Sequence, residues 1–457
     1  MLSLKELKKI ARATVESMRI GRKPNKGIKK ARKKFGPVVD KLLKLNQFTE
    51  KQLNEKERKI VEKLKDPEYG PLIIEKNKNY MVKKEVGQTV RLVYSSVDKE
   101  CVKLAQLIKE ECWKKGAHVT DLTYSSEESR RHLQLIPFDT AAELPEVSKL
   151  FAGAYDARIF LGGEEDINWT RGLEEKIKMG APASQKIHAI IDRKKVRWCY
   201  FGWPIEKKQM FVNKNYYRKV FYESIKTTFS PVVKKICGYY RRALENSDEI
   251  IITAKDGTDL KFSIKGRPIL VADGMIDEND IERGDVGLNI PDGEVFVAPL
   301  ENSAEGYIIF DFVTIPGFGK VTNLEVEFNK GKIVWFDSPQ KKIFEKFLDS
   351  NVGDKDRIAE FGIGTNPAAK YVGETIVDEK IFGSIHIAIG NNTGAYHGKN
   401  KASSHLDMIK MMKGKGGNVF VDKKIVMRDG LPVGLKKIEL YRIKYGNKAS
   451  KPFGSNY

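Results

Sequence analysis

Hydrophobic positions in the first 86 residues recur with the period of an α-helix and stand among many lysines. In the first segment they form one helical face: Leu4, Leu7, Ile10, Ala11 and Val15. The sequence GRKPNKG at 21–27 interrupts this pattern. A second helical stretch follows Pro37, and a third, over about residues 50–65, stops before Asp66-Pro67. These patterns predict a helical N-terminal extension over residues 1–86.

Residues 87–205 alternate between β-rich runs and helical stretches. TVRLVYS, HVTDLTYS, ARIFLGG and VRWCYFGWP fit short strands, and the segments between them carry apolar residues at helical spacing. Strands that alternate with helices are typical of a parallel sheet with right-handed crossovers. We predict a parallel α/β domain over residues 87–205, followed by a helical connector over residues 206–246. LGGEED, inside the α/β domain, lacks the GxGxxG pattern of a dinucleotide loop.

From residue 247 onward the pattern turns to β. EIIITAKDGTDLKFSIKG fits a hairpin with Asp256-Gly257 at its turn, and GEVFVAP, GYIIFDFV and LEVEFNKGKIVWFD continue the alternation. A helix is expected over residues 340–350, and NVFVDKKIVMRDG fits another hairpin. Residues 247–457 are therefore predicted to form a β-rich α+β domain.

The net charge of +21 is concentrated near the N-terminus. Residues 1–86 hold 25 lysines and arginines against 11 acidic residues, which accounts for 14 of the 21 excess charges. This asymmetry indicates a basic module added to a more neutral body. Two roles for it stay open: helices packed on the body or on a partner subunit, and an arm that contacts nucleic acid.

The composition also indicates the cellular compartment of the protein. The chain has no run of about 18 apolar residues, so no membrane span is expected, and MLSLKELKKIARA lacks the apolar core of a secretory signal. None of the four cysteines stands in a CxxC pair: Cys101, Cys112, Cys199 and Cys237. This pattern favours a cytoplasmic protein with structural thiols over a disulfide framework or a thiolate zinc site.

Histidine is concentrated in one segment. Of six histidines in the chain, three lie within residues 360–407: His386, His397 and His405. Carboxylates surround them: Glu360, Glu374, Asp378, Glu379 and Asp407. Histidine and carboxylate together are the usual ligands of zinc, cobalt or manganese, so this segment predicts a metal site and, with it, hydrolysis.

Local patterns indicate how the segment presents its side chains. In GSIHIAIG (383–390) a strand would turn the isoleucines to the core and His386 to the other face. His405 and Asp407 share a face only on an extended backbone. Glu360 in RIAEFGIG and Glu294 in PDGEVFVAP each place one acid in an apolar strand, which is unfavourable unless the acid binds a cation or a donor. Structural roles for the two histidines stay open alongside metal binding.

Other motifs point away from alternative chemistries. GIGTN (362–366) lacks the Lys-Ser/Thr of a phosphate loop, and DENDIERGD (277–285) lacks EF-hand spacing and is expected to be a solvated loop. The chain has no GxSxG, and no cysteine lies near a histidine of the segment, which disfavours serine and thiol hydrolases. Glu379 is expected to orient a ligand imidazole without itself binding metal.

In series, these motifs resemble the thermophilic metallo-aminopeptidase family of the aminopeptidase T type. The resemblance covers roughly residues 87–440. It rests on PDGEVFVAP, RIAEFGIGTNP, DEKIFGSIHIAIG and SSHLDMI, in that order, with RKKVRWCYFGWP at 193–204 further upstream. Residues 1–86 have no counterpart in this series.

The resemblance implies two divalent ions (zinc, cobalt or manganese) and removal of N-terminal residues from short peptides by a homodimer. The implied ligands are Glu294, Glu360, His386, His405 and Asp407. Glu360 is also expected to act as general base. The family places a tyrosine seven residues after its first ligand histidine, where this chain has Thr393, so Tyr396 is the candidate for that role.

The leading functional prediction is a cytoplasmic dinuclear metallo-aminopeptidase. The alternative is a catalytically altered member of the family that acts as a binding protein, with the basic arm contacting nucleic acid or a partner subunit. The charge asymmetry between residues 1–86 and the rest of the chain motivates this alternative.

Overall fold

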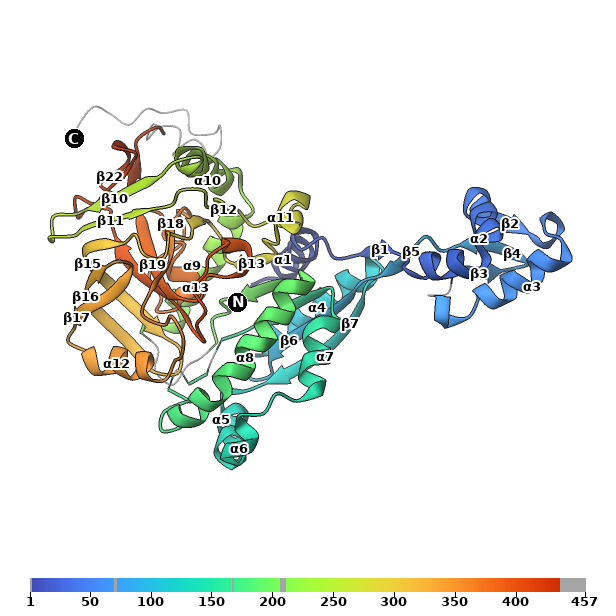
Figure 1. The fold of residues 1–457 in the computed structure, drawn as a ribbon, viewed down its shortest axis with the longest axis horizontal. Helices are drawn as coiled ribbons and strands as arrows, with labels where there is room; N and C mark the ends of the chain where they lie inside the picture. The colour runs from blue at the N-terminus through green and yellow to red at the C-terminus, as the bar shows by residue number, and fades with distance from the viewer. Residues whose placement is uncertain (1, 70–71, 164, 167, 206–210, 436–457) are drawn as a thin grey trace.

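In this computed structural model the chain forms a β-rich body, an α/β body and a small module at the end of a two-stranded stalk (Figure 1). The described residues are 2–69, 72–163, 165–166, 168–205 and 211–435. Across these ranges no helix combines the length and the apolar character needed to cross a bilayer.

A parallel sheet with strand order β13-β9-β8-β6-β7 forms the α/β body. The alternation predicted from the sequence is present in β6 (Thr89–Ser95), α4 (Lys99–Lys114), β7 (His118–Tyr124), α5 (Ser126–Leu135), α6 (Phe138–Ala141), α7 (Glu146–Ala154), β8 (Ala157–Leu161), α8 (Glu174–Lys194) and β9 (Arg197–Phe201). The fifth strand, β13 (Gly287–Ile290), comes from the C-terminal half of the chain and pairs with β9.

The segment before β13 corrects one expectation. Residues 277–285 were expected to be a solvated loop, whereas α11 (Glu278–Arg283) forms there. Asp277 and Asp280 cap the start of this helix reciprocally, each side chain accepting a hydrogen bond from the other's backbone N–H. The acidic residues therefore serve the helix N-terminus, where negative charge is favourable.

Helix α1 (Leu4–Ser17) belongs to the α/β body. A reciprocal cap between Ser3 and Glu6 starts it, and its buried apolar face packs on α4 and joins the core of the parallel sheet. The guanidinium of Arg197, on β9, donates to the carbonyls of Met18 and Arg19 just after the helix. These contacts fix α1 to the sheet before the chain leaves for the module.

The chain enters and leaves the module through an antiparallel ribbon of β1 (Arg22–Pro24) and β5 (Glu85–Gly87). Between them lie α2 (Gly27–Leu45), β2 (Gln47–Thr49), a 3-10 turn (Glu50–Gln52), α3 (Glu55–Leu64), a second 3-10 turn (Pro67–Tyr69), β3 (Ile73–Lys76) and β4 (Asn79–Val82). The strands form a sheet of order β2-β4-β3, and the module has its own apolar core.

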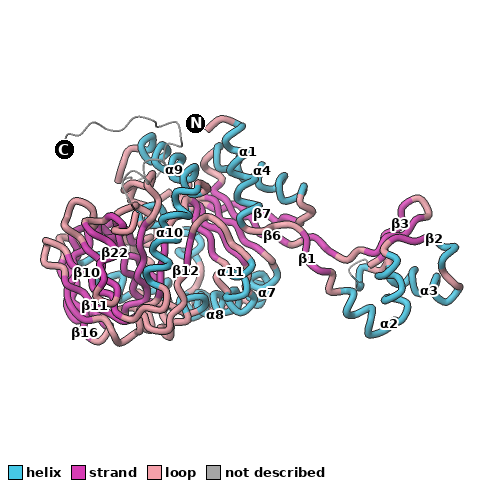
Figure 2. The backbone as a smooth tube through the Cα atoms, turned by 90° about the horizontal axis from the view of Figure 1, so that it is seen from above, coloured by secondary structure: helices cyan, strands magenta, loops and turns pink. Residues whose placement is uncertain are grey.

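The three helices predicted in residues 1–86 are therefore present, but one uniform helical extension is not. Asn77 and Lys78 both have positive φ (52° and 63°), as a tight hairpin between β3 and β4 requires. The strands of the module are only three or four residues long, so the alternation of apolar and polar residues in them is too short to identify them in the sequence. Figure 2 shows the module lying well away from the two bodies, joined to them by the ribbon.

The predicted helical connector consists of α9 (Lys214–Thr228) and α10 (Pro231–Leu244). Apolar residues of α9 join the core of the α/β body, and those of α10 join the core of the β-rich body. The connector thus ties the two bodies together.

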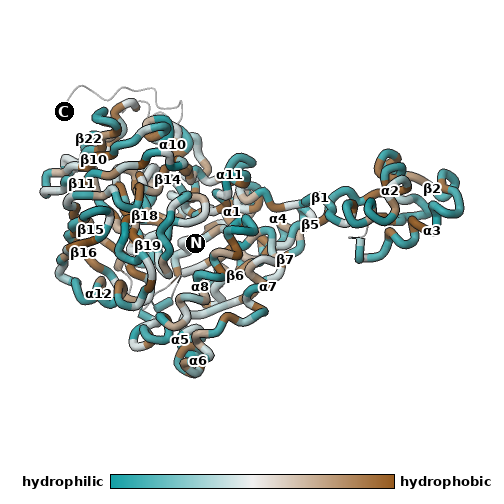
Figure 3. The backbone as a smooth tube through the Cα atoms, in the orientation of Figure 1, coloured by the Kyte–Doolittle hydropathy of each residue, from teal (hydrophilic) through white to brown (hydrophobic). Residues whose placement is uncertain are grey.

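The β-rich body is a large, mainly antiparallel sheet that curls around a continuous apolar core (Figure 3). Its order is β12-β14-β18-β19-β20-β15-β11-β10-β21-β22-β23, with β16 on β15 and β17 on β16. The strands are β10 (Glu249–Thr253), β11 (Asp259–Ser263), β12 (Leu270–Ala272), β14 (Glu294–Val297), β15 (Glu305–Ile315), β16 (Gly319–Asn329), β17 (Lys332–Asp337), β18 (Ile358–Gly364), β19 (Ser384–Gly390), β20 (His405–Met411), β21 (Asn418–Val421), β22 (Lys424–Arg428) and β23 (Leu431–Pro432). Helices α12 (Lys341–Asp349) and α13 (Thr375–Asp378) lie in its connections.

Candidate metal centre

Four adjacent strands, β14, β18, β19 and β20, bring the predicted ligands to one face of the curled sheet. Glu294 pairs with Gly364, His386 with Gly362, and Asp407 with Ala388. Because alternate residues of a strand share a face, this register places all five side chains on the same side. They are Glu294, Glu360, His386, His405 and Asp407.

The opposite face explains the orientation of His386. Ile385, Ile387 and Ile389 lie in the apolar core, so the imidazole between them must point to the other side of β19. Gly362 lies across from it on β18, and a Cβ at this position would come within 2.0 Å of Nε2 of His386. Only glycine at position 362 leaves enough space for the imidazole of His386.

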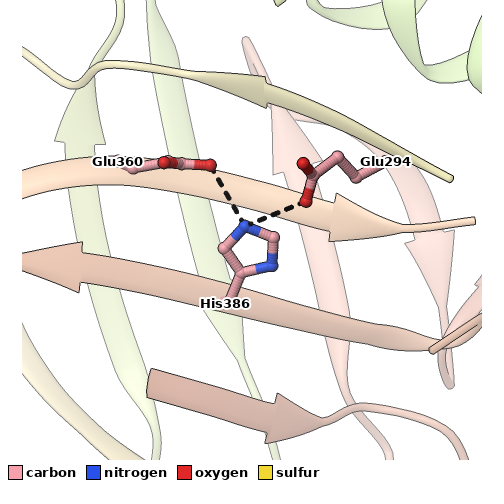
Figure 4. Close-up of side chains that lie close together, drawn as sticks. All are labelled: Glu294, Glu360 and His386. Atoms are coloured by element: carbon pink, nitrogen blue, oxygen red, sulfur yellow. Dashed lines mark hydrogen bonds and ion pairs between the residues drawn. The ribbon is translucent and has the colours of Figure 1, made fainter. Parts of the chain in front are cut away.

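A first cluster consists of Glu294, Glu360 and His386, all buried (Figure 4). Nε2 of His386 lies 3.1 Å from Oε1 of Glu360 and 3.5 Å from Oε2 of Glu294. Within the described residues, neither Nδ1 of His386 nor Oε2 of Glu294 has a hydrogen-bond partner. Buried polar atoms are rarely left in this state, so the cluster has unused capacity for a ligand.

A second cluster consists of Glu360, His405 and Asp407, closer to the surface. Nε2 of His405 lies 3.1 Å from Oε2 of Glu360 and 3.5 Å from Oδ1 of Asp407. Nδ1 of His405 lies 2.8 Å from the carbonyl of Asn391, which fixes the ring and leaves Nε2 directed at the carboxylates. The two clusters share Glu360, with one carboxylate oxygen facing each imidazole.

Burial and pairing set the charges of these groups. Burial opposes ionisation of Glu360, but the hydrogen bonds with His386 and His405 outweigh it and hold the pKa of this carboxyl well below its usual range. Burial also opposes protonation of His386, yet the contact with Glu360 raises its pKa to about 9. The pKa of His405 is raised against burial by Asp407 and Glu360. A cation that enters here must replace imidazole protons.

Tyr396 reaches the centre from the loop after β19. Its hydroxyl donates to Oε2 of Glu360 at 2.8 Å, and its ring packs between Phe296 and His405. Thr393 instead bonds with the side chain of Asn391 at 3.3 Å. The structure therefore brings Tyr396 to the carboxylates and leaves Thr393 outside them.

His397, the remaining histidine of the segment, follows Tyr396 with a positive φ of 54°. Its carbonyl accepts a hydrogen bond from the guanidinium of Arg267. Neither cluster of candidate ligands includes it.

Lys380 is the residue that sequence reasoning missed. Its side chain is fully buried, in close ion-pair contact with Glu294, 2.6 Å from Glu379 and 3.8 Å from Asp292. Burial opposes its charge, but these carboxylates, Glu294 first, raise its pKa above the usual range. A lysine beside acids in VDEKIFG reads as solvated, and only the apolar residues after it hint at burial.

The environment of Glu379 corrects a further expectation. Glu379 was expected to orient a ligand imidazole, but it pairs with Lys380 and accepts a hydrogen bond from the side-chain amide of Asn289. Burial raises the pKa of Glu379 to about 8 despite the contact with Lys380. Lys380 therefore lies between Glu379 and Glu294 and contacts both carboxyl groups.

The donor set fits divalent cations. In each cluster the candidate ligand atoms lie within 4.8 Å of one another, and the donors are imidazole nitrogen and carboxylate oxygen. Zinc, cobalt and manganese accept this combination. All four cysteines are buried, and neither cluster of candidate ligands in the described residues includes one.

Comparison with solved structures shows what the fold resembles. Wild-type AmpT from Thermus thermophilus matches with a TM-score of 0.59 at 19% identity, over 76% of this chain and 94% of AmpT. A 2,5-dihydroxypyridine dioxygenase from Pseudomonas putida KT2440 matches with a TM-score of 0.49 at 15% identity, over 76% of this chain and 92% of that one. Among curated proteins, none matches the sequence.

Comparison with family models gives a stronger result. The model of the thermophilic metalloproteases (M29) matches residues 67–430, a span that contains every residue of the centre. It confirms the family that the sequence motifs resembled. This chain belongs to the thermophilic metalloprotease (M29) family.

Proposed function

We propose that the protein is an aminopeptidase that removes N-terminal residues from short peptides with the help of two divalent ions. One observation carries the proposal: two groups of three ligand residues lie side by side and share Glu360. A carboxylate between two ions is the usual arrangement in dinuclear hydrolytic sites. The metalloprotease family and the AmpT-like fold support the same reaction class.

Each cluster has its own set of ligands. Glu294 and His386 would hold one ion, His405 and Asp407 the other, and Glu360 both. Bound divalent ions supply Lewis-acid polarisation of the scissile carbonyl and lower the pKa of water. Zinc, cobalt and manganese all suit these donors.

The protein's own groups contribute proton transfer and hydrogen bonding. Glu360, which lies between the two clusters, is the proposed acceptor of a proton from the attacking water. The hydroxyl of Tyr396, which donates to Glu360, is placed to donate to the developing oxyanion of the substrate. Lys380 holds Glu294 and balances its charge.

The proposal includes a cytoplasmic location and a homodimeric assembly. Four buried, unpaired cysteines support a reducing, cytoplasmic environment. A homodimer is proposed from the family resemblance alone.

Turnover of a leucine anilide tests this function. Chelated protein should be inactive and should recover with added cobalt, zinc or manganese. Glu360→Gln should lower kcat by about 10²–10⁴-fold, the usual contribution of a positioned general base. Glu327→Gln, at an exposed position of β16, is the matched control and should keep full activity. Metal-independent turnover, or full activity of Glu360→Gln, would overturn the two-metal proposal, and no turnover with any of the three metals would leave the binding-protein alternative.

A further inference from the structure

We propose that the stalked module binds nucleic acid through a row of lysines that begins at the residue before α2 and runs along the first half of that helix. This lysine row is Lys26, Lys29, Lys33 and Lys34. It lies on the module, outside the metal centre, so the proposal does not depend on the enzymatic function.

Sequence composition sets the charge of this surface. Between Glu16 and Asp40 the chain contains no acidic residue. The same stretch contains nine basic residues: Arg19, Arg22, Lys23, Lys26, Lys29, Lys30, Arg32, Lys33 and Lys34. Such a run on a folded element is the electrostatic footprint expected of a phosphate-binding surface.

The helix sorts these side chains by face. Ala31 is buried in the module core, with Ile28 and Phe35 packed against it. The lysine row occupies positions i, i+3, i+7 and i+8, and all four residues are exposed. At Phe35 the helix is kinked (φ −135°, ψ 31°), and the second half begins with Pro37, so the row ends there.

Ion pairing leaves the row uncompensated. Lys30, which falls on the same helical face as the row, pairs with Glu68 at 2.6 Å, and Arg32, beside that face, pairs with Asp40 at 2.7 Å. For the four lysines of the row, no carboxylate of the described residues lies within ion-pair distance. Like charges three or four positions apart on a helix repel one another. A polyanion would relieve this repulsion and release its own counterions.

The rest of the module surface favours nucleic acid over a membrane or a protein. Among the described residues of the module, Met81 is the only large apolar side chain that is highly exposed. Membrane insertion needs an apolar face beside the basic one, and a protein interface needs an apolar centre. Figure 3 shows α2 coloured mainly as hydrophilic. Contacts with the phosphates of nucleic acid need basic side chains but no exposed apolar surface.

Fluorescence anisotropy with labelled oligonucleotides tests the proposal. Full-length protein is titrated into single-stranded RNA and into duplex DNA between about 50 and 200 mM salt. Replacing the four lysines of the row by glutamine should weaken binding at least tenfold. It should also reduce the slope of log K against log salt by about 3, because each phosphate contact contributes about 0.7–0.9. Binding of either probe supports the proposal and tells which nucleic acid is preferred.

A second fourfold variant is the matched control. Lys51, Lys56, Lys59 and Lys63 are exposed on the same module, and each lies within two residues of a glutamate. Their replacement by glutamine removes the same charge and should leave the slope almost unchanged. Circular dichroism and leucine-anilide turnover should be unaltered in both variants.

Three results would overturn the proposal. The first is no binding of either oligonucleotide, or binding that does not depend on salt. The second is an equal loss of affinity in the two variants. The third is binding to phosphatidylserine vesicles or to polyglutamate that matches or exceeds binding to the oligonucleotides, which would assign the row to a membrane or to an acidic protein.

Discussion

Replacing Lys380 by methionine removes a buried cation that contacts three buried acids. Lys380 is fully buried, and its ion pairs reach Glu294, Glu379 and Asp292. Methionine fills a similar volume without charge. Glu294 would then lose the contact that holds one of its oxygens, while its other oxygen already has no hydrogen-bond partner in the described structure.

The size of the effect follows from burial. Removing one partner of a buried ion pair destabilises a protein by about 3–5 kcal/mol, because the remaining charge is left uncompensated. For a body of this size each kcal/mol corresponds to about 2–4 °C in Tm. The metal-free Lys380→Met variant should therefore melt about 6–20 °C below the wild type.

Lys410→Met is the matched comparison within the same sheet. Lys410 is also fully buried, but its partner Asp256 keeps 28% of its side-chain surface exposed. Water can solvate that carboxylate, so we expect a cost of only about 1–2 kcal/mol. Calorimetry of the chelated proteins measures both differences. Elemental analysis after metal loading should show that Lys380→Met retains less metal than Lys410→Met.

One ordering of the results would refute the reasoning. If Lys380→Met is as stable as Lys410→Met and binds the wild-type amount of metal, the Lys380 contacts neither compensate the buried acids nor position Glu294.

Further predictions concern the tyrosine, one buried acid and the stalk. Tyr396→Phe should lower kcat by about 10²–10³-fold with little change in KM or metal content, because it removes one hydrogen-bond donor to the centre, whereas Thr393→Ala should behave like wild type. Burial raises the pKa of Asp285 to about 7, so between its usual pKa and 7 only the unfolded chain is deprotonated and stability falls as pH rises. Urea unfolding of Asp285→Asn should show a gain of up to about 4 kcal/mol above pH 7 and almost none below the usual pKa of aspartate; an equal gain at both would contradict this origin. Replacing residues 25–84 by Asn-Gly should close the β1–β5 ribbon with a tight turn and leave peptidase activity within about twofold of wild type; loss of activity would mean that the module supports the centre.

The strands that carry the candidate metal centre are predictable from the sequence because their hydrophobic patterns are strong. The isoleucines around His386 and the spacing of His405 and Asp407 indicated which way the side chains face, and β19 and β20 confirm both. Glu294 is different. Nothing in its own segment tells that β14 pairs with β18, so its place among the ligands came from the family resemblance.

Other features depend on contacts between distant segments. Lys380 reads as a surface residue until Asp292 and Glu294, from a distant segment, join its neighbour Glu379 around it. Strand β13 has four residues, too few for periodicity to reveal, and its partner β9 lies far earlier in the chain. The docking of α1 on α4 likewise follows from packing that no local pattern expresses.

The pairing of β1 with β5 has a consequence for the order of folding. Helices α1 and α4 pack together, although residues 18–98 separate them in sequence. The entropy lost on closing a flexible loop grows with the logarithm of its length. If residues 27–82 fold first around their own core, the flexible part shrinks to about a third and the closure term falls by about 1 kcal/mol. The folded module therefore holds the two ends of this segment close together and lowers the entropy lost when α1 packs on α4.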